Sequence, residues 1–292
     1  MNRVDNAIIM AAGTSSRFAP LSFEKPKALI EVKGEVLIER QIRQLKEAGV
    51  PEIYVVTGYK AEAFRYLQGK YGVRLLHNPE YNTRNNNASI KAAEDVLNNS
   101  YVCSADNYFL KNPFEREVGS AYYAAVFSQG PTKEWCIQSD ENDVIRGVTI
   151  GGENSWYMLG HTFWDTSFSA AFCRILDEEY DRAETANKLW EDIYIEHLDE
   201  LTMKIQKYPN DFIFEFDSLD ELREFDSSYK ADTHSVILKK ISYALGIGEE
   251  DIRSIAAFKN HSNEAAGFTF RVGERLYRYT YQTGKMECEG GE

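Results

Sequence analysis

The sequence has 292 residues, 43% of them hydrophobic, so it can bury a sizeable core and is expected to form one large domain with a small appendage. Acidic residues outnumber basic ones 46 to 33, and the net charge of -13 excludes a general nucleic-acid surface because phosphate backbones would be repelled. The four cysteines form no CxxC pair, and no apolar stretch approaches the roughly 18 residues of a membrane span. We therefore expect a cytoplasmic protein with no zinc cluster, no disulfide framework and no membrane insertion.

The first hundred residues alternate between strand and helix patterns. AIIMA, at residues 7–11, is a fully apolar run typical of a buried parallel strand. Because parallel neighbours need crossover connections, the alternation predicts an α/β fold with a doubly wound, mostly parallel, Rossmann-like sheet. Ligands of such sheets bind at the carboxyl ends of the strands. After residues 7–11, the expected helices are 36–50, 60–72 and 86–99, and the expected strands are 52–58, 73–78 and 100–106.

From about residue 120 the pattern changes to strands joined by turns, which predicts a mixed extension of the sheet. Two helices then precede a strand pair, and the polar stretch 219–235 is interpreted as a linker or an exposed final helix. The expected strands are 121–128, 134–139, 143–152 and 155–164, followed by helices 167–180 and 187–200 and the strand pair 203–208 and 212–217.

The last part of the chain reads as a separate small α+β unit. We expect a main domain at residues 1–228 and an appendage at 229–292. Within the appendage, residues 235–255 suggest two helices, and 266–281 suggest a hairpin that turns near 272–274.

The turn after the first strand carries small side chains and is followed by two basic residues. Backbone N–H groups of such a turn can converge on phosphate oxygens, and Arg17 and Lys27 would add positive charge. Neither a P-loop nor a GxGxxG fingerprint is present, and the turn by itself is also compatible with a simple strand-to-helix connection. The predicted cradle consists of Ala11, Ala12, Gly13, Thr14, Ser15, Ser16 and Arg17.

Two aspartates follow expected strands. Asp106 comes after VCSA, and Asp217 comes after FIFEF. Two carboxylates that converge from separate strands would form a hard-oxygen site suited to Mg²⁺, which would offset phosphate charge. For either residue alone, capping of a turn is the alternative.

The string AAGTSSRFAPLSFEKPKALIEVKG closely resembles the signature of nucleotidyltransferases that couple a nucleoside triphosphate to a phosphorylated sugar or alcohol. Five later stretches narrow the resemblance to the bacterial CTP:phosphocholine cytidylyltransferases: NPEYNTRNNNAS, SYVCSADNYFLKNPF, KEWCIQS, KLWEDIY and IFEFDSLDEL. The resemblance covers roughly residues 5–226. It implies transfer of CMP from CTP to phosphocholine, which gives CDP-choline and pyrophosphate.

The resemblance also implies roles for the residues above. The first loop would wrap the triphosphate, Arg17 and Lys27 would contact its oxygens as the catalytic cations, and Asp106 and Asp217 would hold the metal ion. Many relatives have glycine where Ser15 stands. Either the loop avoids a positive φ at this position, or the serine hydroxyl itself donates a hydrogen bond.

For the base and the acceptor, the resemblance points to three more groups. It places Asn85 and Asn86 next to the nucleotide, although a run of asparagines that includes Asn87 is also an ordinary helix N-cap region. Choline has a quaternary ammonium that aromatic faces and a carboxylate can hold. Trp135, Trp190 and Glu191 match such a pocket, and the alternative is that both tryptophans are core residues.

The sequence departs from the family pattern at two acceptor positions. Relatives can carry an aromatic residue where Leu189 stands and an aspartate where Glu191 stands. The acceptor could therefore be phosphoethanolamine, a phosphonate or a sugar 1-phosphate instead of phosphocholine. A non-catalytic nucleotide-binding regulator is a further alternative.

Residues 235–280 resemble the beginning of a choline-kinase-like amino lobe. The chain stops before the catalytic loop of a kinase, so kinase activity is not expected. Docking or dimerisation remains open for this unit, as does an interaction module centred on residues 230–292. The resemblance leaves the oligomeric state undetermined.

Overall fold

The computed structural model describes residues 1–261 and 265–289, which fall into two compact units. The first unit comprises Met1–Gly13 and Leu37–Glu215, and the second comprises Thr14–Val36 and Phe216–Glu292. The expected domain boundary after residue 228 lies within the second unit and stays a prediction.

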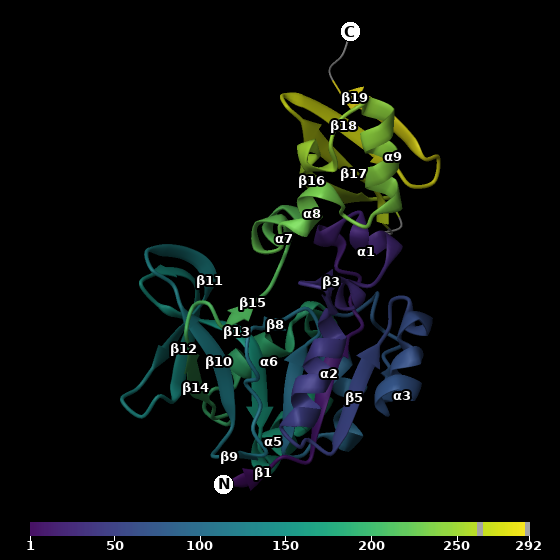
Figure 1. Ribbon diagram of the computed structural model, residues 1–292. Helices are drawn as coiled ribbons and strands as arrows, with labels where there is room; N and C mark the ends of the chain where they lie inside the picture. Colours follow the sequence, from purple (N-terminus) through teal and green to yellow (C-terminus); the bar gives the residue numbers. More distant parts are fainter. Residues whose placement is uncertain (262–264, 290–292) are drawn as a thin grey trace. The chain divides into compact units, whose positions relative to one another are not determined.

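The first unit contains most of the regular secondary structure (Figure 1). Its strands are β1 Asn2–Arg3, β2 Asn6–Ala11, β5 Glu52–Thr57, β6 Arg74–His77, β7 Ser100–Ser104, β8 Tyr108–Phe109, β9 Glu117–Val118, β10 Tyr122–Phe127, β11 Pro131–Ser139, β12 Ile145–Glu153, β13 Trp156–Trp164, β14 Lys204–Tyr208 and β15 Ile213–Phe214. Its α-helices are α2 Leu37–Glu47, α3 Tyr66–Tyr71, α4 Asn87–Lys91, α5 Thr166–Glu179 and α6 Trp190–Glu196, and its 3-10 helices are η3 Ala61–Phe64, η4 Glu94–Val96 and η5 Ala183–Asn187.

The main sheet of this unit has nine strands and two halves of different character. Strands β6, β5, β2 and β7 pair in parallel, as the alternation of the first hundred residues predicts. Strands β13, β11 and β12 continue the sheet in antiparallel pairs, and β10 pairs with β13 and β14. The predicted doubly wound, Rossmann-like fold with a mixed extension is confirmed.

Apolar residues of the parallel strands explain why the helices flank this sheet. The side chains of Ile8, Val56 and Val102 join one buried cluster with residues of α5 and α6. Since successive side chains of a strand point to opposite faces, Ala7 and Ile9 are directed to the other face. Helix α2 buries Ile38, Ile42 and Leu45 along one side and lies across the sheet from α5 and α6 (Figure 1).

Several sequence predictions in the first unit are wrong in detail. The expected helix at 60–72 is η3 followed by α3, and the expected helix at 187–200 is shortened to α6. The expected helix at 86–99 is instead α4 and η4, two short pieces separated by residues 92–93. The expected strand pair 203–208 and 212–217 does not form, because β14 pairs with β10 and β15 pairs with β8. A strand pattern fixes the face that is buried, but it does not determine the partner strand.

The second unit joins a segment near the start of the chain to the C-terminal part (Figure 1). From the first segment come η1 Ser16–Phe18, α1 Leu21–Glu24, η2 Lys27–Leu29, β3 Glu31–Val32 and β4 Glu35–Val36. From the second come α7 Leu219–Phe225, α8 Ser228–Ala231, α9 Val236–Leu245, η6 Glu249–Asp251, β16 Arg253–Lys259, β17 Ala265–Val272, β18 Arg275–Thr280 and β19 Lys285–Glu289.

The C-terminal part contains a four-stranded antiparallel sheet in the order β16, β17, β18, β19. The hairpin expected at 266–281 is present as β17 and β18. The second helix expected within 235–255 is absent, because Glu249–Asp251 forms a 3-10 turn and Arg253 begins β16. Phe268 and Phe270 of β17 are fully buried, and this packing outweighs the weak helical pattern of the preceding residues. Within the described residues, the structure contains no helix both long and apolar enough to cross a membrane.

Candidate active site

The predicted phosphate loop leaves the carboxyl end of β2. Ala11 and Ala12 are buried, whereas Gly13 has open space where a side chain would begin. Ser15 adopts a φ of 47°, so the alternative in which the loop avoids positive φ is wrong. A left-handed conformation is costly for serine, and it turns the backbone so that Ser15 O accepts from Phe18 N–H at 2.9 Å.

The two predicted catalytic cations differ in exposure. Lys27 stands at the start of η2 with only 6% of its surface exposed, and its ammonium lies 5.5 Å from the centre of the Phe18 ring. The Arg17 side chain is 76% exposed and forms a 2.7 Å ion pair with Asp217, one of the predicted metal ligands. Both cations belong to the second unit, as does Asp217.

The other predicted metal ligand, Asp106, belongs to the first unit and follows β7. The turn that carries it is held on both sides. Ala105 N–H donates to Met10 O at 3.1 Å, and the buried amide of Gln41 donates to the carbonyls of Ser104 and Asn107 at 2.8 Å. A half-buried carboxylate is thus fixed at the end of a parallel strand, where ligands of such sheets bind.

The asparagine run connects helix α4 to the segment before α6. Asn85 donates to Asn187 O at 3.1 Å, and the buried Asn87 donates to Thr185 O at 2.9 Å. Asn86 donates to Glu191 Oε2 at 3.1 Å and accepts from Trp190 N–H at 2.7 Å. No side-chain cap bond joins Asn86 to its own helix. Asn86 thus occupies the N-cap position of α4, as the alternative has it, while its side chain bonds to the first turn of α6.

Glu191 is the carboxylate with the most unusual environment in this group. Burial raises its pKa to about 7, while hydrogen bonds from Asn86 and from the Tyr123 hydroxyl, at 3.3 Å, favour the ionised form. A carboxyl group whose pKa lies near neutrality responds strongly to a nearby cation. Such a carboxyl group can bind an ammonium group in its ionised form. When no cation is present, it is uncharged in a fraction of the protein molecules.

The two predicted acceptor tryptophans occupy different surroundings. Trp190 is 1% exposed and packs against Tyr123, with the ring centres 5.7 Å apart, and against Trp164 at 5.1 Å. Its indole N–H has no hydrogen-bond partner among the described residues. Trp135 is half-buried on β11, opposite Ile150 of β12. Trp135 is thus the ring with accessible surface, and direct contact of either ring with an acceptor stays a prediction.

The structure adds two residues that the sequence analysis did not select. Gln41 holds the turn of Asp106, and Tyr123 donates to Glu191. Gln41 lies in helix α2 and Tyr123 lies in strand β10, and the sequence patterns of both are those of ordinary core elements. Only the burial of a polar side chain distinguishes them, and burial follows from tertiary packing. A polar residue on the apolar side of a helix was the one available signal for Gln41.

A small-residue loop, a buried lysine and a strand-end carboxylate are groups suited to a nucleoside triphosphate, since phosphoryl chemistry depends on positioning and charge neutralisation. The model of the MobA-like NTP transferase domain matches residues 7–141. The chain is a nucleotidyltransferase.

The relatives define the family more narrowly. The choline-phosphate cytidylyltransferase of Streptococcus pneumoniae is 33% identical over 224 residues, which cover 77% of this chain and 98% of the relative. The 2-aminoethylphosphonate cytidylyltransferase of Lancefieldella rimae is 37% identical over 229 residues, or 77% of this chain and 93% of the relative. The solved CTP:phosphocholine cytidylyltransferase of Streptococcus pneumoniae matches with a TM-score of 0.74, covering 78% of this chain and 100% of that structure. The chain belongs to the choline-phosphate cytidylyltransferase family.

Proposed function

We propose that this protein transfers CMP from CTP to phosphocholine and releases pyrophosphate. The observation that carries the proposal is the 33% identity with the Streptococcus pneumoniae choline-phosphate cytidylyltransferase along 98% of its length. In the reaction, a phosphate oxygen of phosphocholine attacks the α-phosphorus of CTP. A new P–O bond forms, the bond to the bridging oxygen breaks, and pyrophosphate leaves.

The chain's own cations serve this reaction by neutralising negative charge. Lys27 is buried, so its ammonium interacts with phosphate oxygens at a lower effective dielectric constant than in water. Arg17 is exposed, and when the nucleotide binds it leaves its ion pair with Asp217 and pairs with the triphosphate instead. The loop from Ala11 to Ser16 provides backbone N–H groups for the same phosphates.

We further propose that the enzyme uses Mg²⁺, held by Asp106 and Asp217. Carboxylate oxygens suit this hard cation, and both carboxylates are half-buried, so each keeps an accessible face. When bound, Mg²⁺ would draw charge from the triphosphate. When Arg17 moves from Asp217 to the phosphates of the nucleotide, the Asp217 carboxylate becomes available to the metal ion.

For the acceptor, we propose that Glu191 pairs with the ammonium group and that Trp135 offers an aromatic face. Trp190 lies behind Tyr123 and supports the ring that donates to Glu191. Asn85 and Asn86 are proposed to border the nucleotide. The side chain of Asn86 is hydrogen-bonded to Glu191 and to the backbone of α6. We therefore propose that Asn86 contributes to base recognition through its own main-chain groups.

A second acceptor has its own support. The Lancefieldella rimae 2-aminoethylphosphonate cytidylyltransferase is 37% identical to this chain. The primary ammonium of 2-aminoethylphosphonate can donate hydrogen bonds to a carboxylate, which a quaternary ammonium cannot. The longer side chain of Glu191 and the absence of an aromatic ring at Leu189 are compatible with this smaller cation.

The test is pyrophosphate release with Mg²⁺ from CTP, UTP, ATP and GTP, crossed with phosphocholine, phosphoethanolamine, 2-aminoethylphosphonate and glucose 1-phosphate. Release from CTP with phosphocholine, and its loss in Asp106→Ala, would support the proposal. Preference for 2-aminoethylphosphonate would replace the acceptor and keep the chemistry. CTP binding without turnover of any acceptor would favour the nucleotide-binding regulator.

We also propose that residues 229–292 resemble the start of a choline-kinase-like amino lobe. A helix, α9, followed by an antiparallel sheet of four strands is compatible with this assignment. Transfer of CMP does not require this part of the chain to transfer a phosphate group.

A further inference from the structure

Lys27 lies in a segment that has little structure of its own. The elements around it, η1, α1, η2, β3 and β4, contain between two and four residues each. Isolated helices of this length are unstable in water, because nucleation fixes several residues for a single hydrogen bond. The shape of residues 16–36 therefore depends on tertiary contacts, and the C-terminal part of the second unit supplies several of them.

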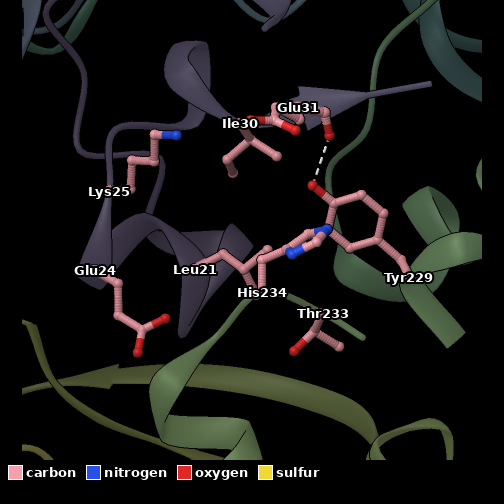
Figure 2. A pocket seen from close by; sticks show the side chains of 8 residues that line it. All are labelled: Leu21, Glu24, Lys25, Ile30, Glu31, Tyr229, Thr233 and His234. Carbon is pink, nitrogen blue, oxygen red and sulfur yellow. Dashed lines mark hydrogen bonds between the residues drawn. The ribbon is translucent and has the colours of Figure 1, made fainter. Parts of the chain in front are cut away.

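Two hydrogen bonds from the C-terminal part hold the chain on either side of Lys27. The Tyr229 hydroxyl donates to Glu31 O at 2.5 Å, as Figure 2 shows. Glu24 Oε1 accepts from Ile237 N–H at 2.9 Å, in the first turn of α9. This N–H group has no partner within its own helix, and a carboxylate near a helix N-terminus is favourable.

An aromatic pair adds a third point of contact. The rings of Phe23, in α1, and Tyr281, after β18, are stacked with centres 3.7 Å apart and an angle of 5° between their planes. Phe23 is 36% exposed, so this stack lies at the surface and is not part of a deep core. All three contacts join the segment of Lys27 to residues beyond 228.

A hollow lies beside two of these contacts, since Glu24 and Tyr229 both line it. It has a volume of about 190 Å³, and Figure 2 shows the residues that line it: Leu21, Glu24, Lys25, Ile30 and Glu31 of the first segment and Tyr229, Thr233 and His234 of the C-terminal part. The two parts therefore leave an open space beside the bonds of Glu24 and Tyr229. Loss of one point can loosen the Lys27 segment without opening a cavity in a packed core.

We propose that the C-terminal part of the second unit is a clamp that sets CTP affinity by holding residues 21–31 in the shape that presents Lys27 to the triphosphate. Tyr229 and Tyr281 are its positioning residues, and the inference rests on the proposed function. The clamp acts on the nucleotide alone. Glu191 and Trp135, the proposed acceptor contacts, belong to the first unit.

The experiment compares the full-length protein with Tyr229→Phe, which removes only the hydroxyl, with Tyr281→Leu, which removes the stacked ring, and with the double variant. Equilibrium binding of CTP is measured by titration calorimetry, and KM is measured for CTP and for the acceptor. Matched controls are Tyr243→Phe and Tyr243→Leu, since Tyr243 is 92% exposed in the same unit.

We expect the Kd and KM for CTP to rise about tenfold in the double variant, because a small misplacement of a binding group costs one to two powers of ten. The acceptor KM should be unchanged, and both Tyr243 variants should match the wild type. Unchanged CTP affinity with a lower melting temperature would overturn the proposal, since the contacts would then serve stability alone.

A second pair of variants applies if the tyrosine variants fail to fold. Glu24→Gln keeps an oxygen that can accept from Ile237 N–H, and Glu24→Ala removes it. The clamp predicts weaker CTP binding in the alanine variant and near wild-type binding in the glutamine variant; equal affinity in both would contradict it.

The same data distinguish this proposal from the proposed function. A wild type that binds CTP but turns over no acceptor refutes the transfer reaction, while its CTP affinity still reports on the clamp. A wild type that binds no CTP overturns the clamp as well.

Discussion

The two units hold their functional residues in different ways. In the first unit, Asp106 follows a fully paired strand, and Glu191 is held by Asn86 and Tyr123 from other elements of regular structure. In the second unit, Arg17 and Lys27 stand on turns of three residues, and Arg17 is largely exposed. The difference indicates that Asp106 and Glu191 are fixed by a paired strand and by side-chain hydrogen bonds, whereas Arg17 and Lys27 depend on tertiary contacts around short turns.

The largest expected effect on turnover comes from changing Asp106, the proposed metal ligand of the first unit. Asp106→Asn keeps the shape of the side chain but removes the charge that would hold Mg²⁺, so turnover should fall about a thousandfold. Turnover of CTP with phosphocholine is the measurement, and Asp177→Asn, an exposed partner of Lys91, is the control. Near wild-type turnover in Asp106→Asn would remove this residue from the site.

The next effect concerns the buried cation of the second unit. Lys27→Met retains most of the apolar volume and loses the charge, so kcat/KM for CTP should fall about a hundredfold or more. Lys25→Met is the matched control, because this neighbour is an exposed lysine two residues away. If both variants lost the same activity, general charge rather than the position of Lys27 would be responsible.

A smaller effect is expected at the acceptor side and depends on pH. The cationic acceptor binds the ionised form of Glu191, whose pKa is about 7. The acceptor KM of the wild type should therefore decrease as the pH rises through about 7, and Glu191→Gln should raise KM about tenfold and weaken this dependence. The KM for CTP should not change. A pH profile that is the same in both proteins would contradict the role of Glu191.

The same carboxyl group should affect stability. Its pKa of about 7 in the folded protein lies above the ordinary value of 4.5, so between these values the folded protein keeps a proton that the unfolded chain has released. The free energy of unfolding should consequently decrease as the pH rises across this window. Melting temperatures of the wild type and Glu191→Gln, compared at about pH 5 and about pH 8, check this. The variant should show the weaker decrease, and equal slopes would exclude Glu191 as the cause.

The smallest effect belongs to the loop of the second unit. Ser15 has a positive φ, and glycine adopts this conformation without steric cost. Ser15→Gly should stabilise the protein by at most about 1 kcal/mol, since glycine also gains freedom in the unfolded chain. Thermal unfolding would measure the change, with Ser16→Gly as the neighbouring control. Marked destabilisation would indicate that the Ser15 hydroxyl itself holds the loop.

The sequence predicts those features that are encoded locally. The apolar run at 7–11 and the small residues after it identify the first strand and its loop, and Asp106 is recognisable at the end of a later strand. The bond between Asn86 and Glu191 is not predictable in this way, because it joins residues 105 positions apart. Local patterns also suggest that β14 and β15 pair with each other, because their actual partners, β10 and β8, lie far away in the sequence.

Burial is the second property that local patterns do not determine. Trp190 and Trp135 look alike in sequence, and one is enclosed by rings from several elements while the other keeps accessible surface. The second helix expected within 235–255 does not form, and Arg253 instead begins β16, which is stabilised by pairing with β17. Both cases depend on neighbours supplied by the fold.

The most direct test of the proposed reaction is the identity of the nucleotide product formed when CTP, Mg²⁺ and equal concentrations of phosphocholine and 2-aminoethylphosphonate compete in one reaction. Mass spectrometry should find CDP-choline as the main product. A product that carries 2-aminoethylphosphonate instead, or no cytidine-containing product at all, would contradict phosphocholine as the acceptor.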